Sequence, residues 1–167
     1  MHHHQCLQLT EHRTELERYF KTHLRPTATL QRLLSIPGVG DITGSTIAME
    51  TGPIHRFADA KHYCSYCRLV PGAKDSGRKR SHRSGSKDGN PYLKYAYTEA
   101  TIKAMMFYPV IKAFATRLGK LSGKAIARTV VAKELAKIVY YTLSRQQEFR
   151  TFKGIEIKKL RNWPRAR

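Results

Sequence analysis

Apolar residues recur at helical spacing along most of the chain, and turn residues separate these stretches. Near the N-terminus, Leu9, Leu16 and Tyr19 lie on one face of a predicted helix that ends near Pro26. Charged residues between them are typical of an amphipathic helix or a short coiled-coil arm. Several of these charges are acidic, so we expect the arm to contact protein rather than DNA.

Six further helices are predicted, over residues 26–34, 41–52, 59–67, 90–108, 109–122 and 123–145. We expect Asp41 to be the N-cap of the third helix, and Asn90 and Pro91 to be the N-cap and first residue of the fifth. In the last helix one face is apolar, at Ala127, Val131, Leu135, Ile138, Val139 and Thr142. We therefore predict a mainly α protein. It has a helical arm at residues 1–25, a compact helical domain at 26–150 and a basic tail at 151–167.

The helical pattern stops between Pro71 and Asn90, where hardly any apolar side chain is larger than alanine. Six basic residues stand there against only two aspartates: Lys74, Arg78, Lys79, Arg80, Arg83 and Lys87. Long loops inside a compact domain are usually functional or disordered. We therefore interpret this segment as a long basic loop that contacts a binding partner of opposite charge.

The chain carries 31 Lys and Arg against 12 Asp and Glu, a net charge of +19. This imbalance is typical of nucleic-acid binding, whereas a ribosomal-type structural protein and a binder of anionic membranes are the alternatives. No apolar stretch has a membrane helix's length, the N-terminus lacks a signal peptide's core, and the cysteine count is odd. We expect a cytoplasmic, nucleoid-associated protein. His2, His3 and His4 are a tag remnant or native, and we assign them no function.

A Gly-x-Gly turn separates the second and third helices, in the run Ile36-Pro37-Gly38-Val39-Gly40. Such a turn exposes backbone N–H groups, which together with the next helix N-terminus can hold a DNA phosphate. This is the helix-hairpin-helix pattern, which contacts the DNA backbone without reading sequence. In the alternative interpretation the turn only packs two helices together. In so basic a chain we predict DNA contact through Pro37, Gly38, Val39 and Gly40.

Ser76 lies near the start of the basic loop. A serine hydroxyl becomes competent toward a phosphodiester when cations hold the phosphate and stabilise the charge of the transition state. In the alternative interpretation the loop only binds DNA and has no catalytic role. Ser81, Ser84 and Ser86 are other candidates for the nucleophile. The sequence identifies no general base, because His82 is near Ser76 in sequence only.

Two other groups of residues have a chemical and a structural interpretation. Cys64 and Cys67 are spaced like half of a zinc site that His55 or His62 would extend, but both fall on an apolar helix face. We therefore predict core packing for them, and no metal site. The aromatic residues Tyr92, Tyr95 and Tyr97 could stack on bases, yet on a helix core or interface packing is the expectation.

Four motifs follow one another in the order and spacing of one family. They are Ile36-Pro37-Gly38-Val39-Gly40, Leu69-Val70-Pro71, Ser76-Gly77-Arg78-Lys79 and Gly89-Asn90-Pro91-Tyr92-Leu93-Lys94. They closely resemble the C-terminal serine domain of the IS-one-ten (IS116/IS110/IS902-type) bacterial insertion-sequence transposases, also called serine-type DEDD recombinases. The late run Ala132-Lys133-Glu134-Leu135-Ala136 resembles the family's closing helix, so the resemblance covers about residues 30–149.

The resemblance implies a role for Ser76. The family's usual Ser-Ser-Gly-Gly-Lys run reads Asp75-Ser76-Gly77-Arg78-Lys79 here, so the second serine, the family's nucleophile, corresponds to Ser76. The implied activity is DNA recombination by cutting and rejoining through a phosphoserine link. We expect Arg78, Lys79, Arg80 and Arg83 to hold the phosphate.

The resemblance also implies partners. The resemblance implies a protein of two parts, a RuvC-like N-terminal half that brings acidic residues and Mg²⁺ and the serine domain. It also implies that a structured guide RNA selects the target. We expect DNA, guide RNA and that half as partners, and a homo-oligomer of the full-length protein, with no cofactor in this chain. The acidic half is missing from the sequence, so we expect a truncated protein or a fragment, inactive in recombination alone. The alternatives are a non-catalytic helix-hairpin-helix module and a structured-RNA-binding protein.

Overall fold

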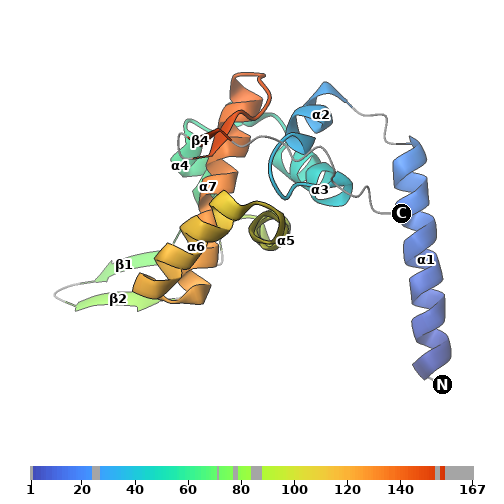
Figure 1. Ribbon diagram of the computed structural model, residues 1–167, viewed down its shortest axis with the longest axis horizontal. Helices are drawn as coiled ribbons and strands as arrows, with labels where there is room; N and C mark the ends of the chain where they lie inside the picture. The colour runs from blue at the N-terminus through green and yellow to red at the C-terminus, as the bar shows by residue number, and fades with distance from the viewer. Residues whose placement is uncertain are drawn as a thin grey trace.

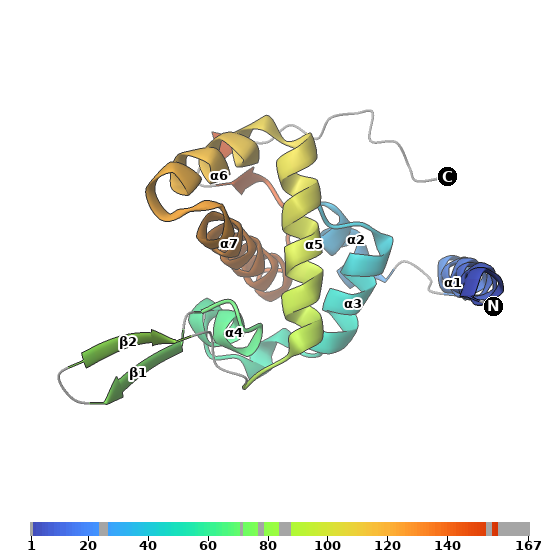
Figure 2. The ribbon, with the colours of Figure 1, turned by 90° about the horizontal axis from the view of Figure 1, so that it is seen from below.

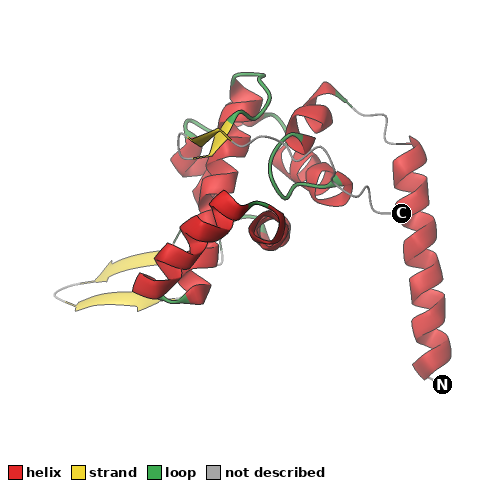
Figure 3. Cartoon of the chain, viewed as in Figure 1, coloured by secondary structure: helices red, strands yellow, loops and turns green. Residues whose placement is uncertain are grey.

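A computed structural model describes residues 2–23, 27–70, 72–76, 79–83, 88–152 and 155–156, with side chains at 4–19, 27–70 and 88–152. Its helices are α1 (His2–His23), α2 (Ala28–Leu34), α3 (Asp41–Thr51), the short 3-10 helix η1 (Ile54–Arg56), α4 (Ala60–Tyr66), α5 (Pro91–Phe107), α6 (Pro109–Ser122) and α7 (Lys124–Ser144). Two antiparallel strand pairs join them: β1 (Gly72–Ser76) with β2 (Lys79–Arg83), and β3 (Thr151–Phe152) with β4 (Ile155–Glu156). The described part of the chain is mainly helical, as predicted (Figure 3).

Helix α7 lies at the centre of the helical body and packs against α4, α5 and α6 (Figure 2). Its buried residues are adjacent or three to four positions apart, which places them on one side of the helix: Ala127, Val131, Ala132, Leu135, Ala136, Val139 and Thr142. The predicted apolar face is confirmed, except that Ile138 is only partly buried.

Short polar side chains begin three of the helices. Thr27 accepts a hydrogen bond from the backbone N–H of Leu30 at the start of α2, and Asp59 accepts one from His62 at the start of α4. Asn90 caps α5, as predicted. The predicted cap at Asp41 is wrong by one residue, because the extended Gly40 precedes α3 and Asp41 is its first residue.

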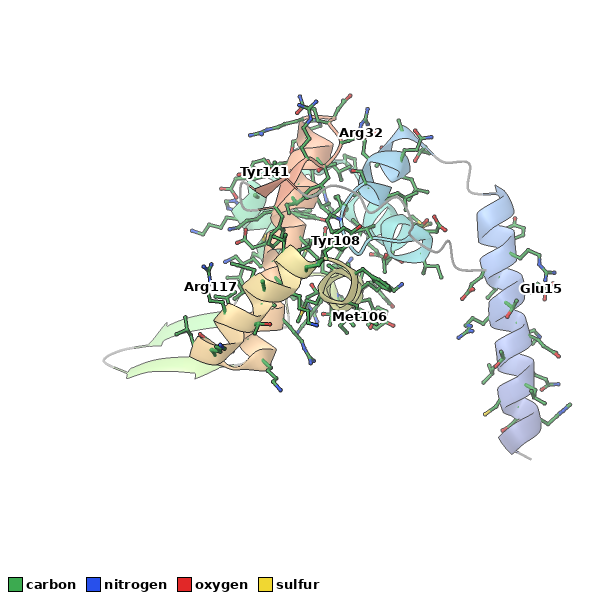
Figure 4. All side chains as sticks on the ribbon, in the orientation of Figure 1. Glu15, Arg32, Met106, Tyr108, Arg117 and Tyr141 are labelled. Atoms are coloured by element: carbon green, nitrogen blue, oxygen red, sulfur yellow. The ribbon has the colours of Figure 1, made fainter. Side chains whose placement is uncertain are left out.

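Helix α1 stands apart from the helical body in both ribbon views (Figures 1 and 2). Leu9 and Leu16, on its predicted apolar face, are 68% and 58% exposed. Glu15 extends into solvent from the same helix (Figure 4). The helical arm is confirmed as a helix, while its contact with another protein stays a prediction.

None of the helices in the described part of the chain combines the length and the apolar character that crossing a membrane requires.

The buried core continues past the last helix. Phe152 in β3 is 1% exposed and packs edge-on against Phe114 of α6, with ring centroids 5.6 Å apart. The predicted domain boundary at residue 150 therefore falls two residues before a core residue. Most of the predicted basic tail, apart from 151–152 and 155–156, lies outside the described residues.

Candidate nucleic-acid interface

The basic segment after α4 contains a two-stranded hairpin that extends away from the helical body (Figures 1 and 2). We expected a loop here, and the pairing of β1 with β2 is a difference from that expectation. The strands contain four cationic residues, Lys74, Lys79, Arg80 and Arg83, against the single acid Asp75. A projecting element of this charge suits contact with phosphates.

Ser76 is the last residue of β1, and the strand register places it opposite Lys79. The preceding Asp75 is opposite Arg80, so the one acidic residue of the two strands is paired in register with a basic residue. The rival Ser81 lies opposite Lys74 in the middle of the hairpin. The remaining predicted residues of this site, Arg78, Ser84, Ser86 and Lys87, lie outside the described part of the chain.

The register also bears on His82 as a general base. His82 is opposite Ala73, which precedes Ser76 by three residues along β1. Three residues of strand span about 10 Å, whereas direct proton transfer needs the donor and acceptor within hydrogen-bond distance. The register therefore disfavours His82 as the base for Ser76.

The chain returns from the hairpin to α5 through a tightly bonded corner. Gly89, at φ +105°, lies so close to the carbonyl oxygen of Tyr66 that a Cβ there would overlap it. The backbone N–H of Asn90 donates to that same oxygen at 2.7 Å, and Arg68 donates to the carbonyl of Gly89 at 2.9 Å. The Gly-Asn-Pro motif thus fixes where the segment that contains the hairpin rejoins the helical body.

Asn90 uses both ends of its amide in this corner. Its oxygen accepts from the backbone N–H groups of Tyr92 and Leu93, at 2.8 and 3.0 Å. Its nitrogen donates to Glu50 of α3 at 2.5 Å. One side chain therefore both caps α5 and ties it to α3.

The predicted DNA-binding turn is largely buried. Pro37, Gly38 and Val39 are buried, and Gly40 is half-buried. A Cβ on Gly38 would overlap the carbonyl oxygen of Ala100 and lie 2.9 Å from the Cβ of Ala104, both in α5. This geometry favours the alternative in which the turn packs helices together.

The amides of the turn also have internal partners. The N–H of Val39 donates to the carbonyl of Ile36 at 3.1 Å, and that of Gly40 donates to the hydroxyl of Thr43 at 2.9 Å. Exposed Asp41 follows as the first residue of α3, and its carboxylate competes with a phosphate for the positive end of the helix. DNA contact through the turn stays a prediction, which the geometry weakens.

Cys64 and Cys67 are both buried in the hydrophobic core, which confirms the packing interpretation. Burial raises the pKa of the Cys64 thiol to about 11 and that of Cys67 to about 12. His62 is exposed and pairs with Asp59 at 2.8 Å, rather than with the cysteines. Within the described residues, no three His, Cys, Asp or Glu side chains are grouped to hold a metal ion.

The three tyrosines after the hairpin do not share one environment. Tyr97 is fully buried, but Tyr92 and Tyr95 are 64% and 66% exposed. Core packing is therefore confirmed for Tyr97, whereas Tyr92 and Tyr95 lie on the solvent side of α5. Interface packing and base stacking both stay open for them.

One basic surface was missed at the level of sequence. Lys112, Arg117 and Lys120 are exposed on α6, where they line a shallow hollow with Pro109, Ala113 and Thr116. The signal was available, because no acidic residue occurs between Glu99 and Glu134.

Comparison with known proteins places the chain among transposases. Residues 30–116, just over half of the chain, match the model of the family described as Transposase IS116/IS110/IS902. A probable family 20 transposase of Pseudomonas aeruginosa is 34% identical over 79 residues, which cover 47% of this chain and 23% of that protein.

Two further relatives agree with this placement. The transposase for insertion sequence element IS1328 of Yersinia enterocolitica is 36% identical, over 52% of this chain and 26% of that protein. The transposase for IS1111A of Coxiella burnetii is 27% identical, over 81% of this chain and 38% of that protein. The matched part of the chain thus spans about a quarter to two fifths of these relatives. The chain belongs to the IS116/IS110/IS902 family of transposases.

Proposed function

We propose that this chain is the domain of an insertion-sequence transposase that binds DNA and supplies a serine nucleophile for strand cleavage and rejoining. The place of Ser76 carries the proposal: it ends β1 in a projecting basic hairpin, with Lys79 opposite. Membership of a transposase family supports a role in transposition, and the net charge of +19 supports a polyanionic partner.

In the proposed reaction the hydroxyl oxygen of Ser76 attacks a DNA phosphorus. A serine O–P bond forms, the bond between phosphorus and one sugar oxygen breaks, and that oxygen takes up a proton while the serine proton passes to a base. A sugar hydroxyl that attacks the phosphoserine reverses the step and rejoins the strand. Arg78, Lys79, Arg80 and Arg83 would hold the phosphate and stabilise its developing charge, with Lys74 and Lys87 gripping the flanking DNA.

Groups outside this domain have to complete such a site. The register disfavours His82 as the base for Ser76, and the described residues contain no group of His, Cys, Asp or Glu side chains that could hold a magnesium ion. We propose that a RuvC-like half contributes the acidic residues with Mg²⁺, that a structured RNA guides target choice, and that the full-length protein forms a homo-oligomer. The projecting hairpin suits this assembly, because it can reach a second protein surface.

The decisive experiment joins this chain to a RuvC-like half from its own element. With Mg²⁺, guide RNA and labelled target DNA, we expect a protein–DNA adduct that resists SDS. Ser76→Ala should abolish the adduct while DNA affinity stays within about twofold. Ser81→Ala is the matched control, because it removes a serine hydroxyl from the opposite strand of the hairpin. This variant should leave the adduct intact.

Each other outcome has a clear meaning. An adduct formed by the Ser76→Ala variant would show that Ser76 is not the nucleophile. Ser81, Ser84 and Ser86 would then be tested in the same way. Tight DNA binding with no adduct from any variant would favour a non-catalytic DNA-binding module. A preference for structured RNA over DNA, lost evenly across many Lys and Arg substitutions, would favour an RNA-binding protein.

A further inference from the structure

The stretch from residue 100 to residue 133 contains seven basic residues and no acidic residue. They are Lys103, Lys112, Arg117, Lys120, Lys124, Arg128 and Lys133. The stretch covers the second half of α5, all of α6 and the first half of α7. Solvated helix surfaces usually mix both charges, so this uncompensated stretch indicates a surface for an anion.

Three of these cations are gathered on α6. Lys112 and Lys120 are eight residues apart, which places them on one side of the helix and about 12 Å apart along its axis. Arg117 lies beside them and is exposed on the outside of α6 (Figure 4). The ion pairs between described residues involve none of the three, although the Arg117 guanidinium also lies over the ring of Phe114, 5.9 Å from its centroid.

The shape of this face favours double-stranded DNA. The shallow hollow between these side chains is open, so it suits a long polyanion better than a small ligand. The spacing of about 12 Å matches the width of the B-DNA major groove, so the two lysines can reach the phosphates on either side of it. Unpaired RNA bases are usually held by aromatic stacking, but the residues that line the hollow are not aromatic.

We propose that the outer face of α6, defined by Lys112, Arg117 and Lys120, is a second contact for the backbone of double-stranded DNA. Figure 2 shows α6 apart from the β1–β2 hairpin, which lies beside α4. The contact rests on DNA as the partner in the proposed function, but not on Ser76 as the nucleophile. It holds the duplex independently of the hairpin.

The test compares two triple variants of the 167-residue chain that remove equal charge. One is Lys112→Gln, Arg117→Gln and Lys120→Gln. The control is Lys61→Gln, Arg145→Gln and Arg150→Gln, at three exposed positions outside this stretch. Glutamine is a good helix former, so both should fold, and far-UV circular dichroism checks this. Fluorescence anisotropy gives the affinity for a labelled duplex as salt rises.

Loss of three phosphate contacts makes the slope of log affinity against log salt less negative by about 2.7. Between about 50 and 200 mM salt, the affinity of the α6 variant should therefore fall roughly 40-fold less than that of the wild type. The control should keep a slope close to the wild type. Equal slope changes in the two variants would overturn the proposal, because they would show a non-specific effect of net charge.

A structured RNA and a single-stranded DNA are the comparison ligands. A loss confined to the RNA would overturn the DNA assignment in favour of an RNA surface. Repeating the titration in a Ser76→Ala background separates the two proposals, since the α6 effect should persist there. A failed adduct experiment would then leave this contact intact, and a failed titration would leave the nucleophile untouched.

Discussion

Gly38 lies directly against the backbone of Ala100, so the turn before α3 and the middle of α5 approach each other without an intervening side chain. Gly38 also has a φ of +82°, a conformation that strains any residue with a Cβ. Gly38→Ala should therefore lower the free energy of unfolding by about 3–5 kcal/mol, from overlap and backbone strain together. Denaturant unfolding measures this loss.

Gly40→Ala is the matched control for this prediction. Gly40 has a φ of −107°, and a Cβ there would meet no atom within 4 Å. We expect a change of no more than about 1 kcal/mol at this position. Equal losses at the two glycines would contradict the close packing of the turn against α5.

The hydroxyl of Tyr63 is the centre of a buried hydrogen-bond chain. It lies 2.8 Å from the hydroxyl of Thr51 and 2.7 Å from that of Tyr97. Tyr63→Phe would leave both neighbours without this partner in a dry core, at a cost of about 1–3 kcal/mol. Tyr95→Phe removes a hydroxyl that is exposed and should change stability by less than about 0.5 kcal/mol. Thermal unfolding compares the two variants, and equal shifts in Tm would argue against a buried hydrogen-bond network at Tyr63.

Much of the helical body could be predicted because its signals are local. The spacing of Val131, Leu135 and Val139 fixes the buried face of α7, and Asn90-Pro91 fixes the start of α5. The role of the Gly-x-Gly turn is not local in this sense. Whether its amides face solvent depends on Ala100 and Ala104, which are small enough to admit the turn but lie more than 60 residues further along the chain.

The hairpin was missed for a different reason. Strands β1 and β2 consist almost entirely of polar, charged and small residues, so they lack the alternation of apolar and polar positions that predicts a strand. The candidate nucleophile could be identified from the family's motif. Its place opposite Lys79 could not, because the register of a polar hairpin leaves little trace in the sequence.

The contact between Asn90 and Glu50 gives a test of the corner after the hairpin. Asn90→Asp keeps the oxygen that caps α5 but replaces the N–H donor with a second carboxylate beside Glu50. We expect a loss of about 1–3 kcal/mol at neutral pH, which shrinks as the pH falls toward 4 and one carboxylate takes up a proton. Urea unfolding across this pH range measures the effect.

A second substitution isolates the cause. Glu50→Gln in the Asn90→Asp background restores a donor and an acceptor, so it should recover most of the lost stability at neutral pH. Failure of this rescue, or a loss that does not depend on pH, would mean that Asn90 acts only as a cap.

The three cysteines should divide into one reactive and two protected thiols. Cys6 is exposed, while burial raises the pKa of Cys64 to about 11 and of Cys67 to about 12. Because the thiolate is the reactive form, a disulfide reagent at pH 8 should consume one equivalent quickly and two more only after unfolding. Cys6→Ser should remove the fast equivalent alone, and a fast second equivalent would contradict the buried placement.

The same pKa shifts set a direction for stability. The unfolded thiols lose their protons near pH 8.5, before the native ones do, so deprotonation favours the unfolded state. The contribution of Cys64 and Cys67 is complete below that pH and is lost as the pH rises toward 11 and 12. Replacing both with alanine should therefore flatten the alkaline fall in stability relative to Cys6→Ser. An unchanged fall would show that other groups cause it.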